Sequence, residues 1–181
     1  REMEFNRLLS SVISTYGEPN LLKSNKIFNV QEKQTSISKK NYYLINKESE
    51  IDKWIKDAEE NGEIAIDTET TSLNPHLAGL VGISLSTKIG SACYIPIGHR
   101  EGHCLSQEKV LKKLKPILED KSIKKIGQNI KFDYIVFFKR GIQINSVEDT
   151  MLMSYVLDAG KNRHNLDTLA EIHLQHKNIS F

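Results

Sequence analysis

The chain has 181 residues, of which 27% are charged and 39% hydrophobic, and its formal net charge is +2. This length allows one sizeable domain with a buried core. No apolar run approaches the roughly 20 residues that a membrane span needs, which predicts a soluble protein without a membrane partner. Two cysteines, Cys93 and Cys104, give no disulfide framework, and the first residues contain no signal peptide; both features favour a reducing cytoplasm.

The first 40 residues are expected to lie outside the main domain. A helix is predicted over residues 1–15, because apolar side chains recur along one stripe until a turn that contains Gly and Pro. Residues 20–40 are polar and without periodicity, and we interpret them as a linker. Since the sequence begins with Arg1, it is expected to be a piece of a longer chain, and the compact domain is expected to begin near Asn41.

The next part of the chain predicts four strands and one helix. A strand over residues 42–45 precedes an amphipathic helix over residues 49–60. The strand over residues 63–70 begins with an apolar run, typical of a buried central strand, and ends in acids. Two more apolar runs, residues 80–85 and 92–97, are expected to pair as a hairpin and to form a meander with that strand.

Helices and short strands alternate in the second half of the chain. The pattern predicts a helix over 107–118, a strand over 122–126, a helix over 129–138, a strand that ends at Val147, and helices over 149–157 and 166–174. This order of elements predicts an α/β fold with a mixed β-sheet and helices on its faces.

Acidic residues stand at two places where strands end. Asp67 and Glu69 point to the same side of their strand, because side chains alternate. The pair either marks the exit of the strand into solvent or holds a divalent metal, since clustered oxygen ligands suit Mg²⁺ or Mn²⁺. Asp133 follows a strand-to-helix junction, where α/β sheets place their sites, and would approach the pair. Alternatively, Asp133 is a solvated acid on a first helical turn, and Gln128 and Asn129 cap that helix.

Several other candidates have ordinary structural explanations. His99, His103 and Cys104 have part of the spacing of a zinc site, without a suitably placed fourth ligand. Cys93 alternates with apolar neighbours and is predicted to lie in the core. One helix is expected to have a solvated face of lysines, Lys109, Lys112, Lys113 and Lys115. A weak attraction for nucleic acid is expected from Lys121, Lys124 and Lys125.

Taken together, the ordered motifs resemble the 3′–5′ proofreading exonuclease domain of bacterial DNA polymerase I, a DEDD exonuclease with the ribonuclease H-like fold. The two main motifs are Asp67-Thr68-Glu69-Thr70-x-x-Leu73 and Gly127-Gln128-Asn129-x-Lys131-Phe132-Asp133. The resemblance extends from about Tyr42 to Phe181 and includes Leu80-Val81-Gly82-Ile83-Ser84, Tyr94-Ile95-Pro96, Asp149-Thr150-Met151 and Arg163-His164-x-Leu166-Asp167-x-Leu169-Ala170.

The resemblance implies how the chain is divided and what it acts on. Residues 41–181 would be the exonuclease domain without its C-terminal part, and residues 1–40 would be a helix and linker from a preceding 5′-nuclease region. The implied partners are DNA with a single-stranded or frayed 3′ end and the polymerase and 5′-nuclease domains of the same parent chain. The implied protein is a monomer that proofreads during replication and repair in the cytoplasm, associated with the nucleoid through DNA.

A two-metal hydrolysis of the 3′-terminal phosphodiester is the implied reaction. Asp67 would bridge two Mg²⁺ or Mn²⁺ ions, Glu69 would hold the ion on the side of the nucleophile, and Asp133 would bind the other ion through water. Contacts with DNA are implied for Leu73, Gln128, Asn129, Phe132, Arg163, Leu166 and Phe181. Of these, Leu73 and Phe181 would pack on the terminal bases, which suits an enzyme that removes any base.

One motif of that family is absent from the sequence. The family's third motif, Tyr-x-x-x-Asp, supplies the last metal ligand and a tyrosine that orients the water, and here no Tyr is followed four residues later by Asp. The motif is expected beyond Phe181. Asp149, Asp158 and Asp167 are poor substitutes, since the first and third are expected to open helices. The 181-residue chain alone is therefore expected to fold but to be nearly inactive.

A second hypothesis for the function is also consistent with the sequence. The chain could be a catalytically lapsed module that binds single-stranded DNA or acts as a structural spacer for the polymerase domain. The intact set of Asp67, Glu69 and Asp133 favours the nuclease, because a lapsed site has no need of clustered acids.

Overall fold

The computed structural model describes residues 10–11, 13–15 and 41–179. The chain divides into two units, residues 1–36 and 37–181. In the first unit the described residues are helical, within the range where the sequence predicts a helix. The predicted linker, residues 20–40, lies outside the described residues.

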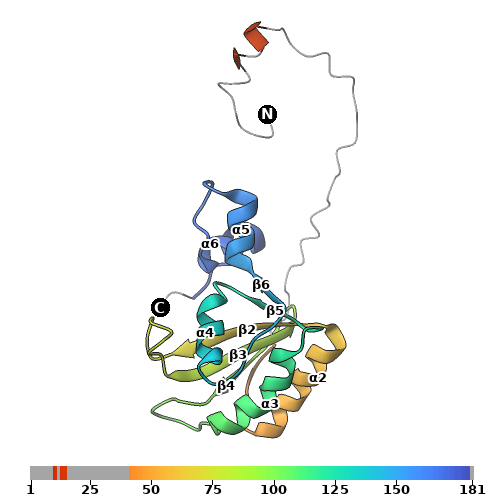
Figure 1. The fold of residues 1–181 in the computed structure, drawn as a ribbon, viewed down its shortest axis with the longest axis vertical. Coiled ribbons are helices and arrows are strands. Elements are labelled where there is room, and N and C mark those ends of the chain that lie inside the picture. Colours follow the sequence, from red (N-terminus) through yellow and green to blue (C-terminus); the bar gives the residue numbers. More distant parts are fainter. Residues whose placement is uncertain (1–9, 12, 16–40, 180–181) are drawn as a thin grey trace. The chain divides into compact units, whose positions relative to one another are not determined.

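The second unit contains a six-stranded mixed sheet, with strand order β1-β4-β3-β2-β5-β6 (Figure 1). Its strands are β1 (Asn41–Leu44), β2 (Glu63–Thr70), β3 (Leu80–Lys88), β4 (Ser91–Pro96), β5 (Lys124–Gly127) and β6 (Val147–Asp149). β3 runs antiparallel to both β2 and β4, which confirms the predicted hairpin and meander. The other neighbours are parallel, and the sheet is therefore mixed, as the sequence predicts.

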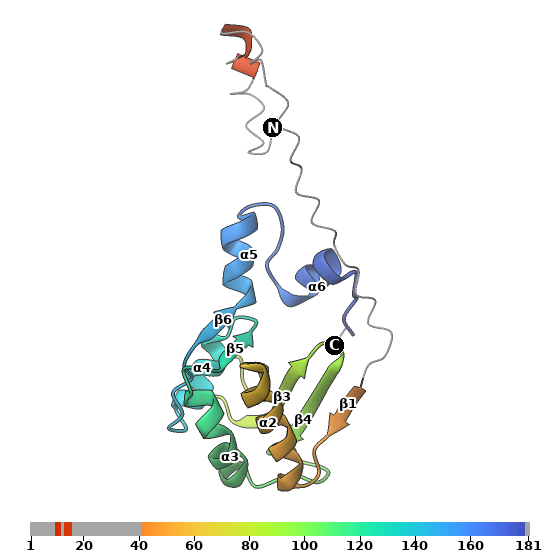
Figure 2. The same cartoon turned by 90° about the vertical axis from the view of Figure 1, so that its right-hand side faces the viewer.

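Helices connect the strands where the apolar periodicity places them. They are the 3₁₀ turn η1 (Glu48–Glu50), α2 (Ile51–Asn61), α3 (Gln107–Glu119), α4 (Lys131–Phe138), α5 (Thr150–Asp158) and α6 (Leu166–Leu174). α2 ends at Gly62, whose φ of 70° lies in the left-handed region that glycine adopts at little cost. α5 extends away from the sheet beyond β6, and α6 follows it (Figures 1 and 2).

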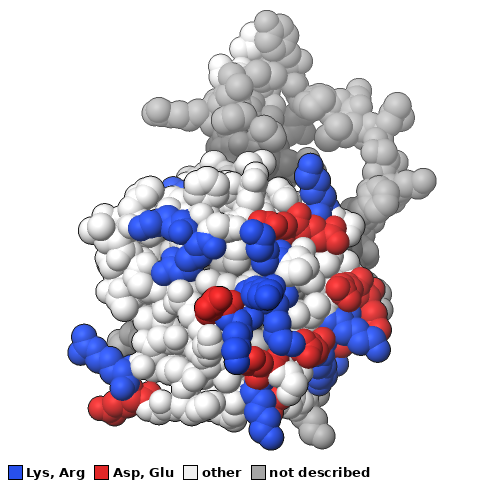
Figure 3. Space-filling model, turned by 60° about the horizontal axis from the view of Figure 1, so that its bottom comes forward, with Lys and Arg blue, Asp and Glu red and all other residues white. Residues whose placement is uncertain are grey.

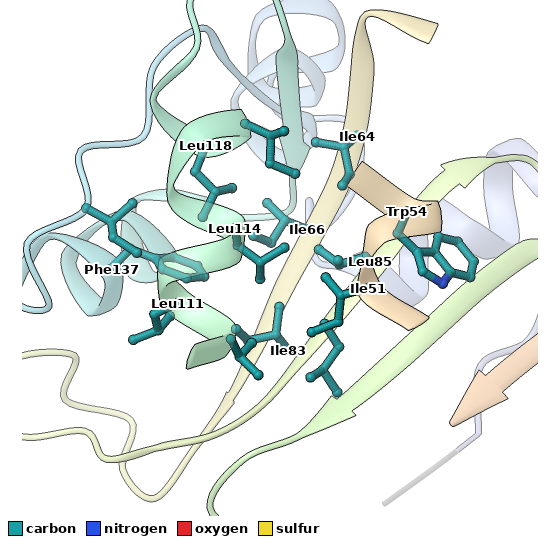
Figure 4. Close-up of a cluster of buried hydrophobic side chains, with 14 of the residues drawn as sticks. Ile51, Trp54, Ile64, Ile66, Ile83, Leu85, Leu111, Leu114, Leu118 and Phe137 are labelled. Atoms are coloured by element: carbon teal, nitrogen blue, oxygen red, sulfur yellow. The ribbon is translucent and has the colours of Figure 1, made fainter. Parts of the chain in front are cut away.

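The hydrophobic core lies on one face of the sheet. Alternate residues of the central strands point into it, among them Ile64 and Ile66 of β2. Figure 4 shows how side chains of α2, α3 and α4 meet this face, including Trp54, Leu114 and Phe137. Each fully buried aliphatic or aromatic side chain stabilises the fold by about 1.5–3 kcal/mol relative to exposure. Because strand residues alternate, the intervening residues of β2 point to the opposite face.

The charged surface near α2 and α3 is mixed in sign. Figure 3 shows Lys and Arg interleaved with Asp and Glu over the face that comes forward. Lys109 of α3 pairs with Glu48 at 3.3 Å, and Lys113 pairs with Asp52. The paired lysines belong to the helix face that the sequence predicts to be solvated, and they do not form a continuous basic patch.

Lys125 does not contribute to a basic surface, contrary to the sequence-based expectation. Its side chain is fully buried. The ammonium nitrogen donates to the carbonyl oxygens of Ile117, Asp120 and Ile123 at 3.3, 2.5 and 2.6 Å. These carbonyls lie at and just beyond the C-terminal end of α3, where backbone acceptors have no partner within the helix. Lys125 therefore caps α3 from inside the protein, while its neighbour Lys124 pairs with Glu148 at the surface.

Lys125→Met is expected to lower the free energy of unfolding by about 2–4 kcal/mol, because the thioether fills similar space but leaves buried carbonyls without a donor. Urea unfolding at pH 7 measures this loss. Lys124→Met is the matched control; it breaks a solvent-exposed ion pair and should change little. Equal losses for the two variants would contradict the capping role of Lys125.

Candidate active site

A cleft of about 500 Å³ opens at the carboxyl end of β2. Its walls are residues 67–73, which include the loop after β2, and residues of the turn from β5 into α4. β2 and β5 are parallel neighbours, so their carboxyl ends reach the same edge of the sheet. Most of the predicted site residues line this cleft, namely Asp67, Glu69, Leu73, Gln128, Asn129, Phe132 and Asp133. Their roles in metal and DNA binding stay predictions.

Asp67 and Glu69 lie on the exposed face of β2. Their partners across the strand pair are Ser84 and Gly82 of β3, which have a small side chain and none. The register shifts after Glu69, which marks a bulge in the ladder. Bulges are common beside active sites, where they redirect side chains. The two acids are therefore uncovered and lie next to each other on one side of the strand.

Asp133 of α4 is hydrogen-bonded to Thr68, a residue of β2 whose side chain is buried. The side chain of Asp133 is only 3% exposed. Its Oδ1 accepts hydrogen bonds from the backbone N–H of Thr68 at 3.0 Å and from the Thr68 hydroxyl at 2.5 Å. The alternative of a solvated acid on a helical turn is thus wrong. The sequence analysis did not identify Thr68 as a residue of the site. Its position between two acids, on the face of the strand that points into the core, was the signal that could have identified it.

The carboxylates of the cleft disfavour one another's charge. Burial raises the pKa of Asp133 to about 6; the Thr68 hydroxyl opposes this shift, and the charge of Asp67 adds to it. Asp67 is exposed on one side, but its partial burial removes water from the carboxylate and raises its pKa. The charge of Glu69 raises this pKa further. The result is a concentration of negative charge that a cation would relieve.

The donor atoms around the cleft fit a divalent cation. The three acids of the cleft, Asp67, Glu69 and Asp133, supply carboxylate oxygens, the ligands that Mg²⁺ and Mn²⁺ prefer. Within residues 10–11, 13–15 and 41–179, no three His, Cys, Asp or Glu side chains come close enough together to hold an ion by themselves. Asp133 is instead turned toward Thr68. Asp67 and Glu69 would therefore be the principal ligands, with Asp133 acting at longer range.

The turn from β5 into α4 is fixed by Asp149. The backbone N–H groups of Asn129 and Ile130 donate to its two carboxylate oxygens, both at 3.0 Å. Asn129 has a φ of 55°, a left-handed conformation that Asn tolerates better than most residues. Asp149 also accepts the N–H of Met151 at 2.9 Å, which confirms its predicted role as the cap of α5. One carboxylate thus ties the starts of α4 and α5 together.

Leu73 projects from the loop at the rim of the cleft. Its side chain is 97% exposed, which is unusual for a large apolar residue. The base of its loop is closed by hydrogen bonds between Thr71 and Gly79 at 2.9 Å. Arg140, which follows α4, donates to the carbonyl of Ala78 at 3.2 Å. The fold therefore holds an exposed apolar side chain beside the acidic cleft.

Two other predicted DNA contacts, Arg163 and Leu166, do not line the cleft. Arg163 is exposed in the loop between α5 and α6, which forms a separate hollow of about 680 Å³. Leu166, at the start of α6, is 55% exposed. Phe181 lies outside the described residues.

Tyr94 is a further residue of this face that sequence reasoning did not assign to the site. A Cβ atom added to Gly82 would lie 1.8 Å from the Tyr94 hydroxyl oxygen, so the Tyr94 side chain extends over Gly82, the partner of Glu69. Its hydroxyl lies 2.7 Å from Nε2 of His99. Burial raises the pKa of Tyr94, and the charge of Glu69 adds to the shift. Gly82 was the available signal, because glycine inside a strand often marks a close approach.

Comparisons with known proteins identify the family to which the sequence is similar. A family model described as a 3′–5′ exonuclease matches residues 42–181. DNA polymerase I of Rhizobium leguminosarum is 41% identical over 152 residues, which cover 72% of this chain and 15% of that protein. DNA polymerase I of Pseudomonas aeruginosa is 40% identical over 146 residues, covering 77% and 16%. The chain therefore spans only a small part of these relatives.

Solved structures share the fold. The structure of Brucella melitensis NrnC with bound Mg²⁺ has a TM-score of 0.57 and 25% identity, covering 79% of this chain and 64% of that one. Escherichia coli RNase D, described as an exoribonuclease, has a TM-score of 0.61 and 20% identity, covering 77% and 35%. These similarities confirm the predicted ribonuclease H-like mixed α/β fold.

Proposed function

The chain belongs to the 3′–5′ exonuclease family found in DNA polymerase I, and we propose that residues 41–181 remove the 3′-terminal nucleotide from single-stranded or mispaired DNA. The observation that carries this proposal is the cleft where Asp67 and Glu69 lie uncovered beside the buried Asp133. The charges of these acids oppose one another, and a bound cation would relieve that repulsion. The chemistry of such a cluster is that of hydrolysis at an anionic phosphodiester.

The three acids would act together in the proposed reaction by holding the cations. Asp67 and Glu69 would hold two divalent cations, Mg²⁺ or Mn²⁺, together with Asp133 at longer range. Bound there, the cations would offset the charge of the phosphodiester and lower the pKa of a bound water. Thr68 keeps Asp133 oriented through its hydroxyl and backbone N–H. The metal of the B. melitensis NrnC structure supports the use of Mg²⁺.

The rim of the cleft supplies the proposed contacts with DNA. Leu73 would pack on the terminal base, and Phe132 and Asn129 would contact the adjoining sugar and phosphate from the cleft wall. Arg163 would bind a phosphate further along the strand. Leu166 and Phe181 remain predicted contacts, on which the described geometry does not bear.

The wider setting is also proposed from the relatives. Residues 1–40 would be the helix and linker from a 5′-nuclease region, and a polymerase domain would belong to the same parent chain, a monomer acting in replication and repair. DNA would hold the protein at the nucleoid in the cytoplasm. Among the helices that the structure describes, none is long and apolar enough to cross a membrane.

A comparison of DNA ends tests the function. In a chain extended through the Tyr-x-x-x-Asp motif, the enzyme should release labelled nucleotide one at a time from a 3′-labelled single strand, and it should digest a mispaired 3′ end faster than a paired one. A narrow cleft admits a single strand, and unpairing matched bases costs free energy. Equal rates on the two ends would count against proofreading. Binding of a single strand by this extended chain, without any hydrolysis in Mn²⁺, would favour the lapsed module instead.

Leu73→Ala is expected to weaken binding of a single-stranded 3′ end about 10-fold, within the roughly 1–3 kcal/mol ascribed to contacts that stack on bases. Its exposed side chain contributes little to the fold. Affinity for Mn²⁺, measured by calorimetry, should stay unchanged. Leu77→Ala, which removes another exposed leucine of the same loop, is the matched control. Similar losses for both variants would show that the loop, and not Leu73, makes the contact.

A further inference from the structure

Both ends of the Gln128 amide are engaged within the protein. Its Oε1 accepts a hydrogen bond from the Thr150 hydroxyl at 2.6 Å. Its Nε2 donates to the backbone carbonyl of His164 at 2.8 Å. An amide can donate two hydrogen bonds and accept two, so these two bonds use half of that capacity and fix the orientation of the amide. Gln128 also forms part of the cleft wall.

His164 is anchored on its other side by α5. Its side chain is 8% exposed. Nδ1 lies 2.7 Å from the Ser154 hydroxyl, and the ring centroids of His164 and Tyr155 are 3.9 Å apart. The imidazole thus fixes His164 against α5, while its carbonyl is fixed to Gln128. Residue 164 therefore joins the loop between α5 and α6 to the turn that forms the cleft.

This joint lies next to Arg163 in the chain. Arg163 is exposed, and it lines the hollow formed by the loop together with Lys161, Asn162 and Asn165. Binding a phosphate through an exposed Arg orders both its side chain and its loop, and this ordering costs free energy. A loop that is already held in place lowers that cost, so the affinity of Arg163 for a phosphate depends on how well the loop is held. The Gln128 amide supplies a hydrogen bond that holds the loop from the side of the cleft.

We propose that Gln128 is a positioning residue, which sets the place of the Arg163 loop relative to the acidic cleft through the Gln128–His164 hydrogen bond. In this role Gln128 acts on the DNA strand through Arg163 and does not contact the strand itself. The part of the proposal that concerns DNA rests on the proposed function. The part that concerns the loop does not.

Limited proteolysis tests the loop directly. Lys161 and Arg163 are trypsin sites within the loop, and cleavage of a folded protein reports how often a segment opens. Gln128→Met keeps the length of the side chain and removes both of its hydrogen bonds, so cleavage in the loop should accelerate at least about 5-fold. Thr150→Val, which removes the bond to Oε1, should give a smaller rise. Cleavage at the wild-type rate in Gln128→Met would overturn the proposal.

A double-mutant cycle tests the effect on DNA. Binding of a fluorescent single strand is measured for Gln128→Met, Arg163→Ala and the double variant in EDTA, which prevents hydrolysis. Each single change should weaken binding several-fold, and the double variant should bind no more than about 2-fold weaker than Arg163→Ala alone. Effects that multiply would mean that Gln128 touches the strand. The affinity for Mn²⁺, measured by calorimetry, should be the same in Gln128→Met as in the wild type. A lower affinity would mean that the substitution disturbs the whole cleft.

The two measurements separate the two proposals. If the wild-type chain binds no single strand, the proposed function fails, and the trypsin rates still decide whether Gln128 holds the loop. If it binds but the effects of Gln128→Met and Arg163→Ala multiply, the positioning role fails and the proposed function stands.

Discussion

Asp133→Asn is expected to lower 3′-end hydrolysis by about 10²–10³-fold, the loss typical of one preorganised catalytic group, and yet to stabilise the metal-free chain at pH 7.5. The loss follows from removing one of the proposed metal-binding carboxylates. The gain follows from burial, since the carboxylate is only 3% exposed. Asn retains an Oδ1 that can accept the same two hydrogen bonds from Thr68 without placing a charge there.

Asp133 makes the stability of the metal-free chain depend on pH. The pKa of Asp133 is raised from 3.8 to about 6 in the folded chain. The folded state therefore holds this proton more tightly than the unfolded state does. The resulting stabilisation is fully present below the unfolded pKa and is lost as pH rises through the folded value. Above that window the charged form costs on the order of 2–3 kcal/mol, as a shift of this size implies.

Urea unfolding in EDTA at pH 4 and pH 7.5 measures this difference. Asp133→Asn should exceed the wild type in unfolding free energy at pH 7.5, and most of the difference should disappear at pH 4. Asp149→Asn is the control, because that carboxylate accepts backbone N–H groups from two helix starts and should be destabilising when replaced at either pH. A stability difference for Asp133→Asn that is independent of pH would contradict the role of burial. Such a trade of stability for activity is common at functional sites.

The sequence predicted those parts of the fold that depend on local pattern. β2 has the predicted bounds, because its apolar run and its acids distinguish the buried part from the exit. α2 ends where Asn61-Gly62 indicates, since glycine adopts the left-handed conformation there. β3 runs on to Lys88, beyond the predicted end at Leu85, because pairing with β2 and β4 continues through polar residues that alternate with buried ones.

The parts that the sequence did not predict depend on tertiary contacts. No local feature tells that β1 pairs in parallel with β4, so that β4 lies between β1 and β3. In the sequence, nothing distinguishes Lys125 from its neighbour Lys124. Lys125 becomes a buried cap because the carbonyls at the C-terminal end of α3 accept its hydrogen bonds. Similarly, the motif that contains Gln128 indicates a site, but the partners of its amide belong to segments more than twenty residues away.

The absence of the Tyr-x-x-x-Asp motif from residues 1–181 is expected to limit the rate of hydrolysis. We expect residues 1–181 alone to hydrolyse single-stranded DNA at least about 10²-fold more slowly than a chimera extended by a segment that carries the Tyr-x-x-x-Asp motif of the family. Asp67 and Glu69 would then keep an ion with one protein ligand fewer. Mg²⁺ demands near-ideal octahedral geometry and fills the gap with water. A misplacement near 1 Å costs about 10² in rate.

Release of labelled nucleotide in Mg²⁺ and in Mn²⁺ measures both chains, and circular dichroism establishes that each is folded. A chimera with Phe in place of the motif's Tyr separates the orientation of water from the extra ligand. The described geometry argues against replacement of that ligand from within the chain. Asp149 is committed to backbone N–H groups, Asp158 pairs with Lys161 at 2.9 Å, and Asp167 accepts from Asn178 at 2.7 Å. Equal activity of the two chains would mean that one of these acids leaves its partner when DNA binds, or that Asp67, Glu69 and Asp133 suffice.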